Sequence, residues 1–292
     1  REVGFSAVVS IGDAVDVDFG DLLDFLALDT ETRGILLYVE GMNHARRFMS
    51  GLRAAARVKP VIVVKAGRHG AGSRAAQSHT SALVAADDVF DAALRRAGAV
   101  RAHSIDQLFA AAQLLASHHR MRGDRLAIVT NGGGPAVMAV DRAADLGLQL
   151  AELSPATLQA LDAVLPAHWP RANPVDILGD AGADRYGEAV RLCLADRGID
   201  GLLVMLTPQA MTDPLACAEA VAAAAAGQDK PVLACWMGED QVASARELLS
   251  HRHIPNFPLP EGAIEAFAYL ASYQQNQQLL LQVPAPLAAR SA

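Results

Sequence analysis

Several kinds of residue are scarce in this chain, and their scarcity excludes several classes of protein. Only 3 of the 292 residues are cysteine, without CxxC spacing, which argues against a disulfide framework or a zinc ribbon. Aromatic residues make up 5%, and the net charge of -7 comes from interspersed charges of both signs, so the basic stripe of a nucleic-acid surface is not expected. No apolar run approaches the roughly 18 residues of a membrane helix. We therefore expect a soluble, cytoplasmic protein that binds neither nucleic acid nor membrane.

Metal-binding and hydrolase signatures are also missing. His118 and His119, like His251 and His253, have no cysteine or carboxylate cluster beside them, so no metal site is predicted. The aspartates between residues 13 and 21 lack the glycine and the final glutamate of a calcium loop. The chain has no GxSxG elbow, so hydrolase chemistry has no support.

What the chain does contain is a regular alternation of short β-branched runs and longer helical patterns, which is typical of parallel βαβ units. It predicts an α/β fold with parallel sheets. In the first part of the chain we expect strands at Ser6–Ser10, Gly34–Val39, Pro60–Lys65 and near Val100, and helices at Phe19–Leu28, Ala45–Val58, Ala82–Ala97 and Ile105–Ser117.

A polar, glycine-containing break at residues 120–124 separates this series from a second one. We place a domain boundary near Gly123, which gives domains over residues 1–122 and 123–281, followed by a Pro- and Ala-rich linker over 282–292. In the second part we expect strands at Leu126–Thr130, Leu148–Ala151, Gly201–Leu206, Pro231–Cys235 and near Ile254, and helices from the glycine run to Leu146 and at Pro155–Leu165, Asp184–Leu194, Pro214–Ala225, Asp240–Leu249 and Ala263–Gln278.

A glycine run lies between the first strand and the first helix of the second part. Asn131 precedes Gly132, Gly133 and Gly134, and Pro135 suits the first helical turn. Bare backbone at the positive end of a helix dipole is a plausible phosphate cradle, and a tight strand-to-helix turn is an equal alternative. The run has neither the GK[ST] ending of a Walker loop nor a GxGxxG fingerprint.

A long glycine-rich loop follows the predicted strand that ends at Lys65. It contains His69 and His79, and it falls where ligand loops lie in parallel α/β sheets, at the carboxyl ends of strands. A lone histidine in such a loop is more commonly a structural hydrogen-bonding residue. Glu40 lies at the end of another apolar strand and could accept a hydrogen bond from the N–H of a histidine ring, although a strand-end glutamate is usually solvated.

Together these segments resemble the ADP-forming acyl-CoA synthetases, relatives of succinyl-CoA synthetase, over essentially the whole chain. The resemblance implies two flavodoxin-like domains, the first of which carries the phosphohistidine loop. It rests on several motifs in one order: Gly4-Phe5-Ser6, Ser10-Ile11-Gly12-Asp13, Asp16-Val17-Asp18-Phe19, Leu36-Leu37-Tyr38-Val39-Glu40-Gly41, Lys65-Ala66-Gly67-Arg68, Ser78-His79-Thr80, Asn131-Gly132-Gly133-Gly134-Pro135 and Asn173-Pro174-Val175-Asp176.

The resemblance also implies roles for individual residues. His79 corresponds to the histidine that takes a phosphoryl group from an acyl phosphate and relays it to ADP, and Glu40 to the carboxylate that orients its ring. Asn131 and the loop from Gly132 to Gly134 correspond to a helix start that stabilises phosphohistidine by preorganised N–H groups. Ser81 and Ala85 replace glycines that are common in the family, which we expect to stiffen this loop.

The resemblance further implies that a CoA-binding domain, together with the first strand and helix of the first flavodoxin-like domain, precedes this chain, and that an ATP-grasp domain or subunit completes the enzyme. CoA, ADP or ATP, and Mg would be bound mainly by those parts, and none of them tightly by this chain alone. We expect this chain alone to be inactive. The partners implied are those domains and a small acyl-CoA substrate, with a homo-oligomer possible and the acyl group left open.

Two other interpretations remain. The segment Phe257-Pro258-Leu259-Pro260-Glu261-Gly262 resembles fusions in which such a region is a regulatory acyl-CoA sensor joined to a GNAT lysine acetyltransferase. The other alternative is a non-catalytic, flavodoxin-like binding module.

Overall fold

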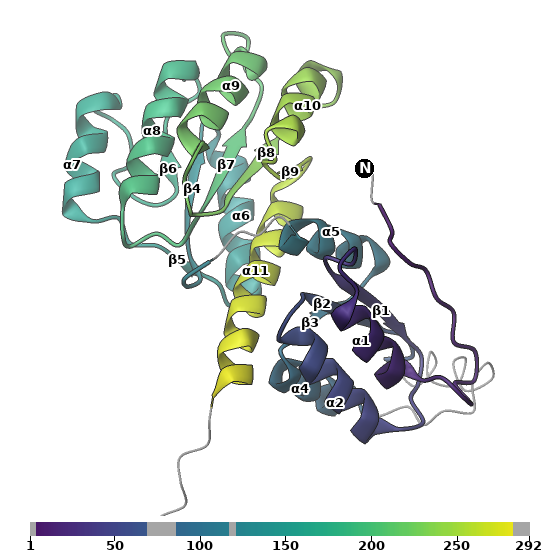
Figure 1. The fold of residues 1–292 in the computed structure, drawn as a ribbon. Coiled ribbons are helices and arrows are strands. Elements are labelled where there is room, and N and C mark those ends of the chain that lie inside the picture. Colours follow the sequence, from purple (N-terminus) through teal and green to yellow (C-terminus); the bar gives the residue numbers. More distant parts are fainter. Residues whose placement is uncertain (1–3, 69–85, 117–120, 283–292) are drawn as a thin grey trace, which may run out of the picture. The chain divides into compact units, whose positions relative to one another are not determined.

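The computed structural model describes residues 4–68, 86–116 and 121–282, which are drawn in colour in Figure 1. The chain forms two compact units. Unit 1 consists of Arg1–Ala116 and Ser272–Ala292, and unit 2 of Ser117–Ala271. The predicted α/β class with parallel sheets is confirmed, because every strand pair in both sheets is parallel.

Unit 1 contains a three-stranded parallel sheet in the order β1-β2-β3. Helices α1, α2 and α4 cover one face of this sheet and α5 the other (Figure 1). The elements are α1 (Phe19–Leu28), β1 (Ile35–Val39), α2 (Ala45–Ala56), β2 (Val61–Lys65), α4 (Asp87–Ala97), β3 (Val100–Ala102) and α5 (Ile105–Ala116).

The start of α1 shows how local sequence determines an element. The Asp18 carboxylate accepts hydrogen bonds from the N–H of Gly20 (2.7 Å) and of Asp21 (3.2 Å). The Asp21 carboxylate accepts in turn from the Asp18 N–H at 3.0 Å. This reciprocal capping satisfies first-turn donors that the helix cannot satisfy itself, and so sets where the helix begins.

The predicted strand at Ser6–Ser10 is wrong, since the structure has no strand there. Val8 is 81% exposed and Val9 54% exposed. A strand needs a neighbour to complete its backbone hydrogen bonds, and among the described residues none pairs with this segment or with the outer edge of β1. A β-branched run by itself was therefore an insufficient signal.

The last turns of α11 (Pro260–Leu281) pack on unit 1. Asn276 Nδ2 donates to the Ala99 carbonyl at 2.7 Å, and Gln277 Nε2 donates to the Gly98 carbonyl at 3.1 Å. Leu280 is 2% exposed within the unit 1 core, and it lies against Gly98, whose φ of +83° favours glycine. The carboxyl end of α11 is thus part of the unit 1 fold.

Unit 2 contains a six-stranded parallel sheet in the order β5-β4-β7-β8-β9, with β6 also paired to β4. Helices α7, α8, α9 and α10 cover one face, and α6 lies with the first part of α11 on the other (Figure 1). The elements are β4 (Arg125–Thr130), α6 (Gly133–Asp145), β5 (Gln149–Leu150), α7 (Pro155–Val164), β6 (Val175–Asp176), α8 (Ala183–Ala195), β7 (Gly201–Leu206), α9 (Pro214–Ala225), β8 (Val232–Trp236), the 3-10 turn η1 (Asp240–Val242), α10 (Ala243–His251) and β9 (Asn256–Phe257).

The short strand β6 is an element that the sequence did not predict. It pairs with the last two residues of β4, Val129 and Thr130, whereas β5 pairs with the first two. The Asn173 side chain lies between these two strands: its Nδ2 donates to the carbonyls of Leu126 (2.8 Å) and Ala151 (2.9 Å), and its Oδ1 accepts from the Ile128 N–H. Asn173 thereby completes the edge of β4 where neither strand reaches.

Across the described ranges, no helix has the length and apolar character needed to span a bilayer.

Candidate functional site

The predicted phosphoryl carrier, His79, lies among residues 69–85, outside the described part of the chain, and so does His69. The structure therefore neither brings His79 together with Glu40 nor separates the two. It does describe the residues on either side of this segment, Arg68 and Ala86, together with the other predicted site residues.

Glu40 directly follows β1 and is partly buried. Since β1 and β2 are parallel and in register, with Val39 opposite Lys65, Glu40 lies at the same end of the unit 1 sheet as the start of the His79 segment. This is the carboxyl end, where ligands bind in open parallel sheets. Its proposed contact with the histidine ring stays a prediction.

The predicted glycine loop connects β4 to α6 at the carboxyl end of the unit 2 sheet. Gly132 is the N-cap of α6, and the Ala136 N–H donates to the Gly132 carbonyl at 3.3 Å, which starts the helix. The Thr130 hydroxyl accepts from the Gly132 N–H at 3.0 Å and donates to the Gly132 carbonyl at 3.2 Å. The loop is thus held by its own strand, with the first-turn amides of α6 at its tip.

The side chain of Asn131 is bonded to Thr207, the residue that directly follows the neighbouring strand β7. Its Nδ2 donates to the Thr207 carbonyl at 2.9 Å, and its Oδ1 accepts from the Thr207 N–H at 2.8 Å. Asn131 is 3% exposed. This paired contact places the loop against the end of β7; a contact of Asn131 with phosphate stays a prediction.

Gly132 has no room for a side chain. A Cβ atom there would lie 2.5 Å from Thr207 Oγ1 and 3.2 Å from Thr207 Cβ. At Gly134 such an atom would meet nothing within 4 Å, so that position is open. Glycine at 132 therefore allows the close approach to Thr207, while Gly134 leaves the helix start accessible.

Two residues near this loop were not predicted as site residues. Thr207 Oγ1 is buried without a hydrogen-bond partner beside Gly132. Asp176 ends β6, and its Oδ2 would lie 3.7 Å from a Cβ atom on Gly133. The sequence held a signal for Asp176 in its Asn-Pro-Val-Asp motif, but Thr207 only follows an apolar strand and becomes visible once the sheet order is known.

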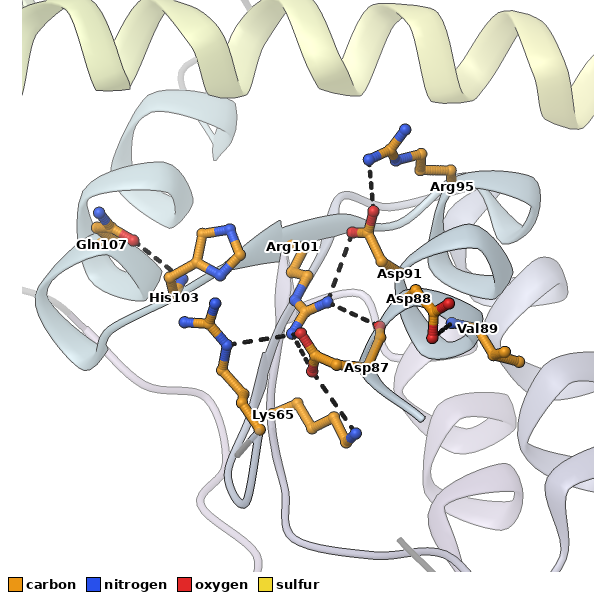
Figure 2. A network of polar contacts seen from close by, with 10 residues as sticks. Lys65, Asp87, Asp88, Val89, Asp91, Arg95, Arg101, His103 and Gln107 are labelled. Atoms are coloured by element: carbon orange, nitrogen blue, oxygen red, sulfur yellow. Dashed lines mark hydrogen bonds and ion pairs between the residues drawn. The ribbon is translucent and has the colours of Figure 1, made fainter. Parts of the chain in front are cut away.

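A second group of charged residues lies at the carboxyl ends of β2 and β3, and Figure 2 shows it. We call Lys65, Arg68, Asp87, Asp91 and Arg101 the Asp87 cluster. The Asp87 carboxylate lies 2.6 Å from Arg101 NH2, 3.6 Å from Lys65 Nζ and 3.7 Å from Arg68 Nε. Asp91 lies 3.7 Å from Arg101 NH1.

The electrostatics of the Asp87 cluster follow from this crowding of cations. Partial desolvation raises the pKa of Asp87, but the hydrogen bond and charge of Arg101, with the charges of Lys65 and Arg68, outweigh it and leave that pKa below its usual value. Burial, followed by the charges of Arg68 and Arg101, lowers the pKa of the neighbouring His103. The cluster is therefore an ionised carboxylate among cations beside a neutral imidazole.

Neither a metal site nor a reactive thiol is found in the described residues. Within residues 4–68, 86–116 and 121–282, no group of three or more His, Cys, Asp or Glu side chains is placed to hold a metal ion. All three cysteines are free and buried, and burial raises the pKa of Cys193 to about 12.

Comparisons with known proteins match both units. Residues 1–115 match the succinyl-CoA ligase like flavodoxin domain, and residues 126–277 match the Ligase-CoA domain. The chain is 40% identical over 273 residues to acetate–CoA ligase (ADP-forming) I of Archaeoglobus fulgidus, covering 94% of this chain and 39% of that protein. It is 37% identical over 277 residues to the subunit alpha of acetate–CoA ligase (ADP-forming) I of Pyrococcus furiosus, covering 94% and 60%.

Among solved structures, the fold is similar to the dinucleotide forming acetyl-coenzyme A synthetase 1 of Ca. Korarchaeum cryptofilum in complex with phosphate and ADP. The TM-score is 0.87 at 33% identity, covering 94% of this chain and 61% of that one. The chain thus spans between about two fifths and three fifths of the length of these relatives.

Proposed function

This chain belongs to the ADP-forming acyl-CoA synthetase family, and we propose from that premise that it carries and cradles the phosphohistidine of such an enzyme. The full-length protein would convert acyl-CoA, phosphate and ADP to the free acid, CoA and ATP. The observation that carries the proposal is the glycine loop, where the closeness of Thr207 requires glycine at 132 and the start of α6 is left open at Gly134. The N–H groups at this helix start suit a phosphoryl group because they are already oriented to donate hydrogen bonds to it, and the helix dipole favours its negative charge.

The proposed chemistry balances in three steps. Phosphate displaces CoA from acyl-CoA and gives an acyl phosphate; an imidazole nitrogen of His79 then takes the phosphoryl group and releases the acid; ADP finally takes it from the histidine and gives ATP. Glu40 would accept the N–H of the other ring nitrogen, which fixes the tautomer and stabilises the positive charge that develops on the ring. Asn131 would hold the loop of Gly132, Gly133 and Gly134 in place through Thr207.

The cofactors and partners are proposed from the same relatives. The alpha-subunit name of the Pyrococcus furiosus relative supports a separate or fused partner, which we take to be an ATP-grasp part that binds ADP, ATP and Mg. CoA would be held by a CoA-binding domain. No group of three or more His, Cys, Asp or Glu side chains among the described residues is placed to hold a metal ion, so no step is assigned to a metal on this chain. We place the protein in the cytoplasm, and a homo-oligomer stays a prediction.

None of the relatives named above is an acetyltransferase, so neither the GNAT-linked sensor nor the non-catalytic module has support from the comparisons.

The proposal is tested by phosphate labelling of the full-length protein with its partner. Incubation with Mg-ATP labelled in the γ-phosphate should give an acid-labile, base-stable signal that disappears in His79→Ala. The matched control is His69→Ala, which removes the other histidine of the same segment and should keep the signal. Label retained in His79→Ala, or no label in the wild-type protein supplied with CoA, would contradict the relay.

A further inference from the structure

We propose that the Asp87 cluster fixes the two ends of the segment that carries His79, and that Asp87 is a positioning residue for phosphoryl transfer; this inference rests on the proposed function. Arg68 is the last described residue before the segment, and Asp87 is the second described residue after it. The Asp87 carboxylate contacts both Arg68 (3.7 Å) and Lys65 (3.6 Å), which ends β2. One carboxylate therefore joins the described residues on the two sides of the segment.

The cluster is anchored on buried strand residues. The Arg101 side chain is 7% exposed in β3; its NH2 lies 2.6 Å from Asp87 Oδ1, and its NH1 donates to the Asp87 carbonyl at 3.2 Å. The Lys65 side chain is 4% exposed, with Nζ 5.3 Å from the centre of the Phe90 ring. Both cations are thus held by the sheet and by α4, and Asp87 takes its position from them.

Arg68 differs from these two cations, because its side chain is 33% exposed and it lies beyond the end of β2. Among the described residues it forms an ion pair with Asp87, the same carboxylate that Lys65 and Arg101 contact. Without the charge on Asp87, three cations would share the single carboxylate of Asp91, which contacts Arg101, and Arg68 is the most exposed of the three cations. The Asp87 carboxylate therefore determines where the chain leaves β2 toward His79.

The site of the cluster also favours an acidic residue as the fixed point. Asp87 is in the first turn of α4, where the helix dipole stabilises negative charge. The neighbouring Asp88 shares the dipole but not the cluster, since its carboxylate is exposed and accepts from the Val89 N–H at 2.9 Å. Asp88 is therefore the matched control for Asp87.

The first test measures the rate of His79 phosphorylation in the full-length protein. Asp87→Asn keeps the shape of the side chain and removes its charge, so we expect the rate to fall roughly ten- to a hundredfold, as for a reacting group displaced by about 1 Å. The KM for ATP should not change, because the proposed function places ATP on the ATP-grasp part and not on this cluster. Asp88→Asn should keep the wild-type rate, and Asp87→Glu should recover part of it. A wild-type rate in Asp87→Asn, or an equal loss in Asp88→Asn, would overturn the inference.

A second variant guards against simple loss of folding. Arg68→Gln removes the exposed member of the cluster and leaves the buried pair of Arg101 and Asp87 intact, so the protein should fold while phosphorylation slows in the same direction. The double variant with Arg68→Gln and Asp87→Asn should be phosphorylated no more slowly than Asp87→Asn alone, because both changes remove the same contact between Arg68 and Asp87. Additive losses would show that the two residues act independently and would refute the proposed role of the Arg68–Asp87 contact.

A third measurement separates this inference from the proposed function. Amide hydrogen exchange at Ala66–Arg68 and Asp87–Val89 should become faster in Asp87→Asn and stay unchanged in Asp88→Asn. This result does not depend on phosphoryl chemistry. If His79→Ala keeps its label, the relay is refuted, and the exchange measurement still tests whether the Asp87 cluster fixes the ends of the segment. If exchange is unchanged in Asp87→Asn, the role of the Asp87 cluster is refuted and the relay is unaffected.

Discussion

The pair of hydrogen bonds between Asn131 and Thr207 provides the sharpest stability prediction. Asn131→Ala removes both bonds and leaves the N–H and the carbonyl of Thr207 without their partner. Asn131 is 3% exposed and Thr207 is partly buried, so water can replace the lost bonds only in part. Each unpaired buried group costs about 1–3 kcal/mol, and after allowance for partial hydration we expect unit 2 to lose about 2–4 kcal/mol.

The protein offers a built-in probe for this measurement. Both tryptophans, Trp169 and Trp236, lie in unit 2 and are buried, with exposures of 4% and 0%. Their fluorescence during urea unfolding therefore follows unit 2 separately from unit 1, which a two-unit chain requires before a free energy is assigned. The midpoint should fall while the slope stays constant.

The matched control is another asparagine of unit 2. Asn256 Nδ2 donates to the Arg246 carbonyl at 3.2 Å and to Ser250 Oγ at 2.9 Å, the second bond being exposed to solvent. Asn256→Ala should cost less than about 1 kcal/mol because water replaces an exposed bond. Equal losses in the two variants, or a loss below about 1 kcal/mol in Asn131→Ala, would refute the claim that Asn131 determines the position of the glycine loop.

Three further predictions concern unit 2. Partial burial raises the pKa of Asp200 but the hydrogen bonds and charge of Arg125 outweigh it, so the folded pKa is depressed; the stabilisation is complete above the unfolded pKa of about 3.9 and is lost as pH falls through the folded value. Asp200→Asn should therefore cost about 1–2 kcal/mol at neutral pH, a figure reduced because Arg125 is 45% exposed, and should flatten the loss of stability in acid seen by the same fluorescence titration. Gly201→Ala would place a Cβ atom 2.5 Å from Phe267 Cε2 in the core and should destabilise unit 2 by about 1–3 kcal/mol in urea unfolding. The control Gly182→Ala, where an added Cβ atom would meet nothing within 4 Å, should leave the midpoint unchanged. A thiol reagent at pH 8 should find no reactive cysteine in the native protein and three after denaturation, because burial raises the pKa of the thiols to about 12, about 11 and about 12 for Cys193, Cys217 and Cys235.

Elements with local signals could be predicted from the sequence. The bounds of α1 agree with the expected Phe19–Leu28 because Asp18 caps the helix within its own first turn. The bounds of β7 agree with Gly201–Leu206, a continuous apolar run of the kind buried on both faces of a parallel sheet. In both cases the information lies within the element itself.

Elements that depend on pairing with distant parts of the chain could not be predicted from the sequence. The strand expected at Ser6–Ser10 lacks a neighbour among the described residues, and β6 exists because two residues pair with the end of β4 while Asn173 bridges the gap beside them. Neither fact can be read from a short window of sequence, since pairing joins residues that are far apart in the chain.

The candidate site divides in the same way. The motifs indicated Glu40 and the glycine loop because each lies at a strand end, and the structure places both at carboxyl ends of sheets. The contact of Thr207 with Gly132 and the meeting of Lys65, Asp87 and Arg101 each join separate elements, so they appear only once the strand order is known. His79 lies outside the described residues, and its role stays a prediction.

The packing of the carboxyl end of α11 within unit 1 sets an order of events during synthesis. A ribosome completes β3 long before it reaches Asn276, Gln277 and Leu280, so the carbonyls of Gly98 and Ala99 stay without their side-chain donors until the end of α11 has emerged. A nascent or prematurely ended chain that stops before Ser272 would leave the carbonyls of Gly98 and Ala99 exposed to chaperones and proteases. Maturation of unit 1 thus waits until α11 has been made.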